Sequence, residues 1–222
     1  MTLTPPSFVI AIDGPAASGK GTLSRRLARH YGFAHLDTGA LYRATGRDVL
    51  ASGLDPGDPD AAARIAAAVD PASFDDPRLR EEAVGQAASV VAAHAGVRAA
   101  LLALQRRFAA TPPGGLAGAV LDGRDIGTVV CPQARVKFFV TASPEVRARR
   151  RVLELEGRGA VADEAAIRAD LIARDTRDRE RAEAPLRPAE DAILLDTSGL
   201  DADAVFALAR AEVDRRLFTR TQ

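Results

Sequence analysis

The feature that most constrains the fold is the stretch FVIAIDGPAASGKGTLSRRLARHYG, residues 8–32, near the start of the chain. Its first part, FVIAID, is a continuous apolar run typical of a strand buried on both faces of a parallel sheet. The turn that follows has the spacing G-x-x-x-x-G-K, in which backbone N–H groups and a lysine surround phosphate oxygens. The helix predicted after the turn adds the positive end of its dipole. These residues therefore predict a nucleotide phosphate loop and favour it over a purely structural glycine turn.

The predicted phosphate contacts come from the loop and the first helical residues: Gly14, Pro15, Ala16, Ala17, Ser18, Gly19, Lys20, Gly21 and Thr22. Lys20 is expected to reach the outer phosphates. Gly21 stands where most such loops have the Ser or Thr that binds Mg²⁺. Binding of Mg²⁺ with the nucleotide is expected through Thr22, through water or mainly through the triphosphate, and no direct protein ligand to the metal is assigned.

The rest of the chain alternates between strand and helix patterns, which predicts an α/β fold with a five-stranded parallel sheet flanked by helices. Strands are expected within residues 8–13, 33–37, 116–125, 135–143 and 191–198. Helices are expected at about 20–31, 39–53, 61–69, 145–157, 163–182 and 201–217, with a further helical region at 79–108 broken near Gly96. Ligands of such a fold bind at the carboxyl ends of the strands.

Composition limits the possible partners and the compartment. The chain has 222 residues, enough for one sizeable core, and its 30 basic and 30 acidic side chains give a formal net charge of zero. Overall charge thus gives no support to nucleic-acid binding. The single cysteine excludes an internal disulfide and fits a cytoplasmic protein. The first residues predict neither a signal peptide nor a membrane span, and a monomer is the default.

Three clusters of arginine and aspartate offer a second anion site. They are LDTGALYR (residues 36–43), LDGRDIG (121–127) and RDTRDRERAEAPLRP (174–188). In the first, Thr38 is expected to cap a helix; in the third, Arg174, Asp178 and Arg181 fall on one helical face. Each cluster could instead be a surface turn or a solvated helix face. Together with a phosphate loop they favour phosphoryl transfer, because arginine forks bind phosphate oxygens bidentately.

No residue near the loop is an obvious catalytic base, and no Ser-His-Asp or metal-ligand arrangement is present in the sequence. An acceptor that is itself a phosphate would explain this absence, because its oxygen is already ionised at neutral pH. Such an acceptor needs positioning and charge neutralisation rather than deprotonation.

Five segments together resemble the bacterial cytidylate (CMP) kinases, which are P-loop nucleoside monophosphate kinases. They are GPAASGKGT, LDTGALYR, AVGQAASVVAAHAGVRAALLALQRRF, LDGRDIGTVVCPQARVKFFVTAS and RDTRDRERAEAPLRPAEDAILLDTS. The resemblance runs almost end to end and is weakest at residues 51–74. It implies ATP-dependent phosphorylation of CMP and dCMP to CDP and dCDP with Mg²⁺, in pyrimidine nucleotide metabolism. It also implies one kinase domain over residues 1–222, with an acceptor-binding insertion at about 52–108 and a lid at about 150–180.

The resemblance assigns roles to single residues of this chain. The residues that it places on CMP are Asp37, Thr38, Arg43, Ser89, Arg98, Arg124, Asp125, Arg174, Asp178 and Arg181. Among these, Ser89, Arg98 and Asp125 are expected to read the cytosine edge, and Arg174 and Asp178 the sugar. The residues expected to be catalytic are Lys20, Arg124, Arg150 and Arg181, with Arg151 as an alternative to Arg150.

Other functions stay open at this point. One alternative is another P-loop kinase acting on AMP, UMP or a non-nucleotide acid. A second is an ATPase or GTPase used as a binding switch, although the guanine-reading motif N-K-x-D is absent from the sequence. A non-catalytic scaffold is disfavoured by the complete glycine loop with its lysine.

Overall fold

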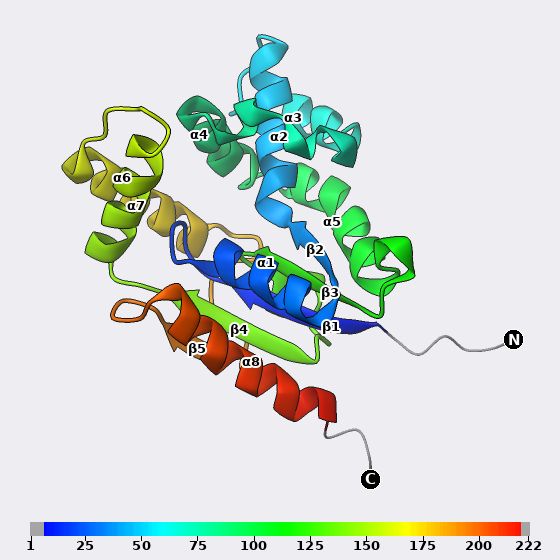
Figure 1. Cartoon of the computed structure of the whole chain (residues 1–222). Helices are drawn as coiled ribbons and strands as arrows, with labels where there is room; N and C mark the ends of the chain where they lie inside the picture. The colour runs from blue at the N-terminus through cyan, green and yellow to red at the C-terminus, as the bar shows by residue number, and fades with distance from the viewer. Residues whose placement is uncertain (1–6, 219–222) are drawn as a thin grey trace, which may run out of the picture.

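The computed structural model, which describes residues 7–218, contains one five-stranded sheet whose strands are all parallel (Figure 1). The strands are β1 (Phe8–Asp13), β2 (Ala34–Asp37), β3 (Gly118–Gly123), β4 (Val136–Thr141) and β5 (Ile193–Asp196), in the spatial order β2-β3-β1-β4-β5. The predicted fold class is confirmed. Since β1 is central and its two neighbours come later in the chain, the loop after β1 lies where the strand order reverses, the usual ligand position in such sheets.

Eight α-helices connect and cover the strands in the described part of the chain. They are α1 (Lys20–Tyr31), α2 (Thr38–Ala51), α3 (Pro59–Ala67), α4 (Glu82–Val91), α5 (Ala95–Ala110), α6 (Pro144–Glu156), α7 (Glu164–Glu180) and α8 (Ala202–Phe218). Short helical turns are η1 (Pro71–Asp75), η2 (Pro77–Arg80), η3 (Pro113–Gly115) and η4 (Ile126–Val130), the last a single π-helical turn. In Figure 1, α2, α3 and α4 gather beyond one edge of the sheet, while α6 and α7 lie on the other side of the phosphate loop.

Alternate residues of the central strand enter two separate cores. Ile10 and Ile12 pack with α1 and α8 on one face, whereas Ala11 packs with α2, α3 and α5 on the other. All three are fully buried. This is the reason why the strand reads as an unbroken apolar run, since both faces of a parallel sheet are covered by helices.

Helix ends follow local chemistry at several sites. Gly32 ends α1 at φ 64°, and its N–H donates to the carbonyl of Ala28. Ser143 caps α6 as expected, with its Oγ accepting from the N–H of Val146 and Pro144 in the first turn.

The predicted break near Gly96 is confirmed to within two residues: it falls between α4 and α5 at residues 92–94, and Gly96 itself lies inside the first turn of α5. A Cβ at Gly96 would lie 3.0 Å from Ala63 Cβ, so the glycine permits close packing of α3 against α5. Thr38 does not cap α2, because its Oγ1 donates to the carbonyl of Asp122, 2.8 Å away on β3.

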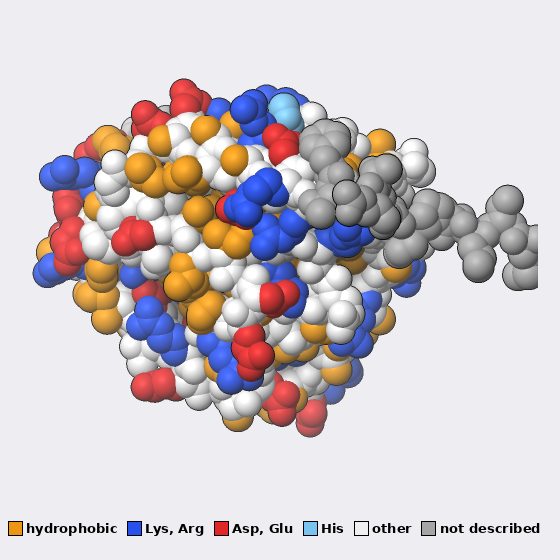
Figure 2. Space-filling model, turned by 90° about the horizontal axis from the view of Figure 1, so that it is seen from below, with side chains coloured by type: hydrophobic (Ala, Val, Ile, Leu, Met, Phe, Trp, Pro, Cys, Tyr) orange, Lys and Arg blue, Asp and Glu red, His pale blue; other side chains and the backbone are white. Residues whose placement is uncertain are grey.

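The surface is mixed in character. Figure 2 shows acidic, basic and hydrophobic side chains interspersed on one face, in keeping with the zero net charge of the sequence. Within residues 7–218 no single helix has the length and apolarity to cross a membrane; one pair bent by 99°, residues 82–91 with 95–115, meets these criteria jointly.

Candidate active site

The phosphate loop connects β1 to α1 and has the backbone geometry of an anion cradle. Gly14 (φ 150°) and Gly19 (φ 91°) have torsions that favour glycine, and a Cβ at Gly14 would lie 2.0 Å from the carbonyl oxygen of Val140. Ser18 is fully buried, and its Oγ is one of three buried side-chain polar atoms of the described residues without a hydrogen-bond partner. A buried polar atom without a partner indicates that a ligand completes the site.

Lys20 opens α1 directly behind the loop. Its Nζ donates to the carbonyl of Pro15 at 3.2 Å. Desolvation and the nearby Arg124 guanidinium lower the pKa of Lys20 to about 7, against the weaker attraction of Asp122 and Asp37. This lysine is therefore held among other cations, in an arrangement that a polyanionic ligand would stabilise.

Side chains from α5, from α7 and the residue after it, and from the two residues between β3 and η4 meet beside the loop in two chains of ion pairs. Arg124 donates to Asp178 Oδ2 at 2.8 Å. Arg98 pairs with Asp125, and Arg181 lies 3.8 Å from the same carboxylate. Burial alone would raise the pKa of Asp178, but the guanidinium groups of Arg124 and Arg174 outweigh it and lower that pKa. The structure thus brings together the predicted residues of the second and third clusters.

The cations of this region exceed the groups that neutralise them. Arg174 is half-buried near Arg124, and desolvation together with that like charge lowers the pKa of Arg174 to about 10. Desolvation and nearby Arg98 also lower the pKa of Arg181. Besides Ser18, the buried atoms without hydrogen-bond partners in the described residues are Arg174 Nε and one terminal nitrogen of Arg181. Crowded guanidinium groups with free donors are suited to binding an anion.

The first cluster lies at the start of α2. Arg43 donates to Asp37 Oδ2 at 2.6 Å, and the Arg43 guanidinium lowers the pKa of this carboxyl despite the opposing effect of burial. Ser89, on α4, is buried and accepts from Arg177 of α7 at 3.3 Å. Ser89 thus touches the helix that carries Arg174 and Asp178. Arg181 is not part of the predicted helical face, because α7 ends at Glu180 and Arg181 follows it in extended backbone.

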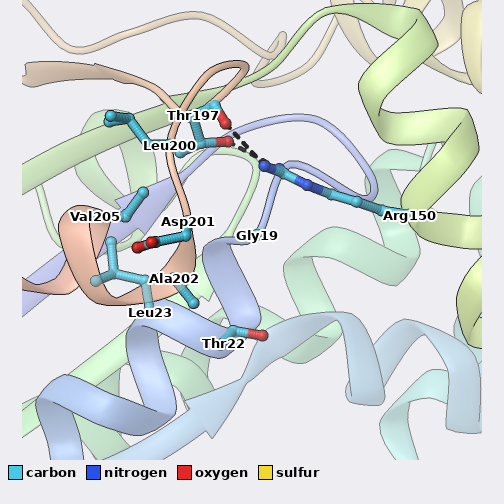
Figure 3. Close-up of a pocket in the computed structure, with 9 residues that line it drawn as sticks. All are labelled: Gly19, Thr22, Leu23, Arg150, Thr197, Leu200, Asp201, Ala202 and Val205. Carbon is cyan, nitrogen blue, oxygen red and sulfur yellow. Dashed lines mark hydrogen bonds between the residues drawn. The ribbon is translucent and has the colours of Figure 1, made fainter.

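A pocket of about 250 Å³ lies on the opposite side of the phosphate loop (Figure 3). Its lining combines loop and helix residues distant in sequence: Gly19, Thr22, Leu23, Arg150, Thr197, Leu200, Asp201, Ala202 and Val205. The apolar side chains suit a flat base. Arg150 spans the rim, donating to the carbonyl of Thr197 at 2.7 Å and to that of Ser18 at 3.3 Å.

Several residues of the site were not predicted. The hydroxyl of Tyr42 accepts from Arg98 at 3.3 Å, and Thr197 Oγ1 donates to the carbonyl of Ser18 at 3.0 Å. Arg147 and Asp175 form a buried ion pair that joins α6 to α7, and Arg147 also donates to the carbonyl of Ala16. In the sequence Arg147 begins the run RARRR, residues 147–151, and a helical run of charges gives no sign of which arginine turns inward.

Two further acidic side chains near Lys20 come from the ends of strands, Asp37 from β2 and Asp122 from β3. A Cβ at Gly21 would lie 3.8 Å from Asp122 Oδ2, so Asp122 lies beside the loop. The other oxygen of Asp122, Oδ1, is hydrogen-bonded to His35 Nε2 at 2.8 Å. In the described residues no group of three or more His, Cys, Asp or Glu side chains is arranged to hold a metal ion.

Comparison with known proteins agrees with this geometry. The family model described as cytidylate kinase matches residues 10–215. A cytidylate kinase of Rhodopseudomonas palustris (strain BisA53) is 64% identical over 197 residues, covering 89% of this chain and 92% of the relative. A cytidylate kinase of Afipia carboxidovorans is 56% identical over 213 residues, covering 96% of this chain and all of the relative.

Solved structures share the fold at low identity. A gluconokinase from Sinorhizobium meliloti 1021 superposes with a TM-score of 0.50 at 14% identity, covering 98% of each chain. An uncharacterized protein from Eubacterium ventriosum gives a TM-score of 0.52 at 14% identity, covering 93% of this chain and 98% of the other. From the family match and the curated relatives, the chain belongs to the cytidylate kinase family and is a phosphotransferase.

Proposed function

We propose that this kinase transfers the γ-phosphoryl group of ATP directly to the phosphate of CMP and dCMP, giving CDP and dCDP for pyrimidine nucleotide metabolism. The family supplies ATP as donor and CMP as acceptor. The observation that carries the proposal is the excess of half-buried cations beside the phosphate loop, in which the buried Arg174 Nε and one buried Arg181 nitrogen have no hydrogen-bond partner. Neither a hydrolase nor a binding switch needs a second anion site of this kind.

The donor is assigned to the loop and to the pocket next to it. Residues 14–22 surround the ATP phosphates, and Lys20 neutralises charge that builds up on the transferring group. The base of ATP enters the pocket of Figure 3, between Leu23 and Val205 on one side and Arg150 on the other. Arg150 then has two tasks, since it contacts the base and lies at the loop carbonyl of Ser18.

The acceptor is assigned to the ion-pair chains. Arg43, Arg124 and Arg181 grip the CMP phosphate, with Asp37 and Thr38 at the start of α2 beside them. Arg174 and Asp178 contact the sugar. Asp125, Arg98 and Ser89 read the cytosine, whose exocyclic amine donates and whose ring atoms accept hydrogen bonds.

The chemical step needs no general base. A phosphate monoester carries close to two negative charges at pH 7, because its second pKa is about 6, so an oxygen of CMP attacks as it is. The two substrates repel each other, and the enzyme lowers this barrier by fixing both among cations that need no reorganisation. Lys20, Arg124 and Arg181 supply this field between the two sites, with Arg150 on the donor side.

Mg²⁺ is proposed to bind with ATP. Carboxylate oxygens suit this ion, and Asp37 and Asp122, which both attract Lys20, would hold it through its water ligands. This arrangement fits a loop in which Gly21 offers no hydroxyl. Mg²⁺ held there would supply charge neutralisation on the phosphate oxygens of the donor.

The wider organisation follows the same scheme. We propose that residues 1–222 act as one kinase domain, with residues 52–108 closing over CMP and residues 150–180 forming the lid over ATP. Glu82 of α4 already pairs with Arg151 of α6 at 3.0 Å, which joins these two parts. The protein is proposed to act as a cytoplasmic monomer that binds neither nucleic acid nor membrane.

The test is an ADP-release assay with Mg-ATP and CMP, dCMP, UMP, AMP or no acceptor. We expect high turnover with CMP and dCMP, low turnover with UMP and negligible turnover with AMP. Equal ADP release with and without an acceptor would mean a hydrolase and would refute the proposal. A preference for AMP would keep a kinase but reject the assignment of Asp125 and Arg98 to cytosine.

A further inference from the structure

Asp13 is a buried carboxylate without a role in the scheme above. It is the last residue of β1 and directly precedes Gly14, the first glycine of the phosphate loop. Only 4% of the residue is exposed. Its two oxygens accept from two consecutive backbone amides, Oδ1 from Ile126 N and Oδ2 from Gly127 N, each at 2.7 Å.

Those amides begin the turn that follows the acceptor residues. Arg124 and Asp125 come immediately before Ile126, and Asp125 has an irregular backbone (φ −148°, ψ 25°) where β3 gives way to η4. A carboxylate bonded to two successive N–H groups fixes both the place and the orientation of the peptide planes on either side of Ile126. The backbone of Asp125 is therefore held against the end of β1.

A carboxylate is the side chain that suits this contact. The amide of Asn has one acceptor oxygen, so its NH₂ group would face one of the two N–H donors and leave that donor unpaired. The contact is also tight, because a Cβ at Gly127 would lie 3.3 Å from Asp13 Oδ2 and 3.1 Å from Lys137 Cδ. Desolvation raises the pKa of Asp13 to about 7 in spite of the two N–H donors, so a carboxyl is a costly choice for a merely structural position.

We propose that Asp13 is a positioning residue that fixes the Arg124–Asp125 segment relative to the phosphate loop, and so sets the distance between acceptor and donor. This inference rests on the proposed function, because it takes Arg124 and Asp125 as acceptor contacts. One carboxylate then belongs to both halves of the site. The donor loop follows it in the chain, and the acceptor segment is hydrogen-bonded to it.

The first test compares Asp13→Asn with wild type, with two controls. Asp214→Asn changes another carboxylate that accepts a hydrogen bond, from the hydroxyl of Tyr31 at 2.7 Å, but on α8 and outside the site. Val213→Ala lowers stability through a cavity in the core on the α8 side, outside the site. We expect Asp13→Asn to raise the KM for CMP about tenfold or more and to narrow the CMP-to-UMP preference, because small displacements of positioning groups cost up to ~100-fold. The KM for ATP should change less than about threefold, since the loop keeps its own backbone.

A second variant covers the case in which Asp13→Asn does not fold. Gly127→Ala disturbs the same contact from the other side. It should also raise the KM for CMP more than the KM for ATP, but by a smaller factor than Asp13→Asn does. If both single variants fold, the KM for CMP of the double variant should rise by less than the product of the two single fold-rises, because both substitutions remove the same contact.

The outcomes separate the two proposals. Wild-type enzyme without CMP-dependent turnover refutes the proposed function, whatever the variants do. With an active wild type, equal rises in the KM for CMP and ATP in Asp13→Asn, or wild-type values in a folded variant, overturn the positioning role. If only Gly127→Ala folds, its KM values decide by the same rule. The two controls should leave the ratio of the two KM values unchanged.

Discussion

The donor and acceptor sides of the site are built in different ways. The donor phosphates are assigned to nine consecutive residues, 14–22, whose backbone does much of the work. The acceptor is assigned to side chains from α2, α4, α5, α7 and the segments beside α2, η4 and α7, which meet only in the folded protein. The donor side can be predicted from one short stretch of sequence, whereas the acceptor side depends on how segments far apart in the sequence pack together.

This difference decides how the two sides respond to substitution. Backbone N–H groups of the loop survive most side-chain changes, so the donor side depends strongly on its one lysine and its two glycines of unusual φ. The acceptor side consists of linked ion pairs such as Arg98–Asp125–Arg181, in which removing one member leaves buried charges unpaired. Substitutions there should act jointly rather than one by one.

The largest effect is expected on the donor side. Lys20→Ala should lower kcat about 1,000-fold, because it removes the one compact cation that reaches the transferring group. Measured melting temperature should stay near that of wild type, since the lysine makes only one hydrogen bond, to Pro15. Turnover close to that of wild type would show that the arginines alone neutralise the donor. The donor side would then not depend on its one lysine, and the contrast drawn between the donor and acceptor sides would be wrong.

Asp125→Ala tests the acceptor side. Loss of a charge-assisted hydrogen bond of about 1.5–3 kcal/mol predicts a rise of roughly 10- to 100-fold in the KM for CMP. The KM for ATP should rise far less. Steady-state kinetics with each substrate varied will measure both. Equal rises would mean that Asp125 holds the whole site together and does not read the base.

Arg150→Ala tests whether Arg150 serves the pocket of Figure 3, which is assigned to the base of ATP, or the transferring phosphoryl group at the phosphate loop. Its guanidinium lies at the rim beside Thr197 and Ser18, so we expect a rise of about tenfold in the KM for ATP with little change for CMP. Arg149→Ala on the same helix is the matched control. A fall in kcat without a change in the KM for ATP would assign Arg150 to the transferring phosphoryl group alone.

The smallest expected effect is an uptake of protons by the protein when it binds the nucleotide. In the free protein the pKa of Lys20 is about 7, and the negative triphosphate will raise it. Binding at pH 7 should therefore take up about half a proton per nucleotide, and this uptake should disappear well below pH 7, where Lys20 is already charged. Calorimetry of a non-hydrolysable ATP analogue in two buffers of different ionisation enthalpy measures it. Lys20→Arg, which keeps the charge without titrating, should lack the uptake seen in wild type.

The sequence predicted what depends on local chemistry. All five strands, the loop, and the cap at Ser143 followed from apolar runs, glycine spacing and the Ser-Pro pair. The break near Gly96 was predicted to within two residues but not the role of Gly96 itself, because a glycine inside a helical pattern can indicate either a break or close packing. Only the contact with Ala63 of another helix distinguishes the two.

Long-range contacts account for what the sequence did not reveal. Thr38 has the residue type of a cap, yet its hydroxyl bonds to a carbonyl of β3, which no local pattern encodes. The pocket of Figure 3 joins Thr22 to Val205 across most of the chain, and Asp13 meets the amides of Ile126 and Gly127, 113 and 114 residues further along. Such pairs follow from sheet order, and sheet order is set by the whole core.

The lowered pKa of Lys20 should also make this side chain selectively reactive toward acylating reagents. The chain has only two lysines, and the other, Lys137, is buried and bonded to Asp191 and to the carbonyl of Pro132. About half of the Lys20 side chains are neutral amines at pH 7, and the neutral amine is the nucleophile. An acylating reagent should therefore modify Lys20 ahead of Lys137 and inactivate the enzyme, and bound ATP should shield it.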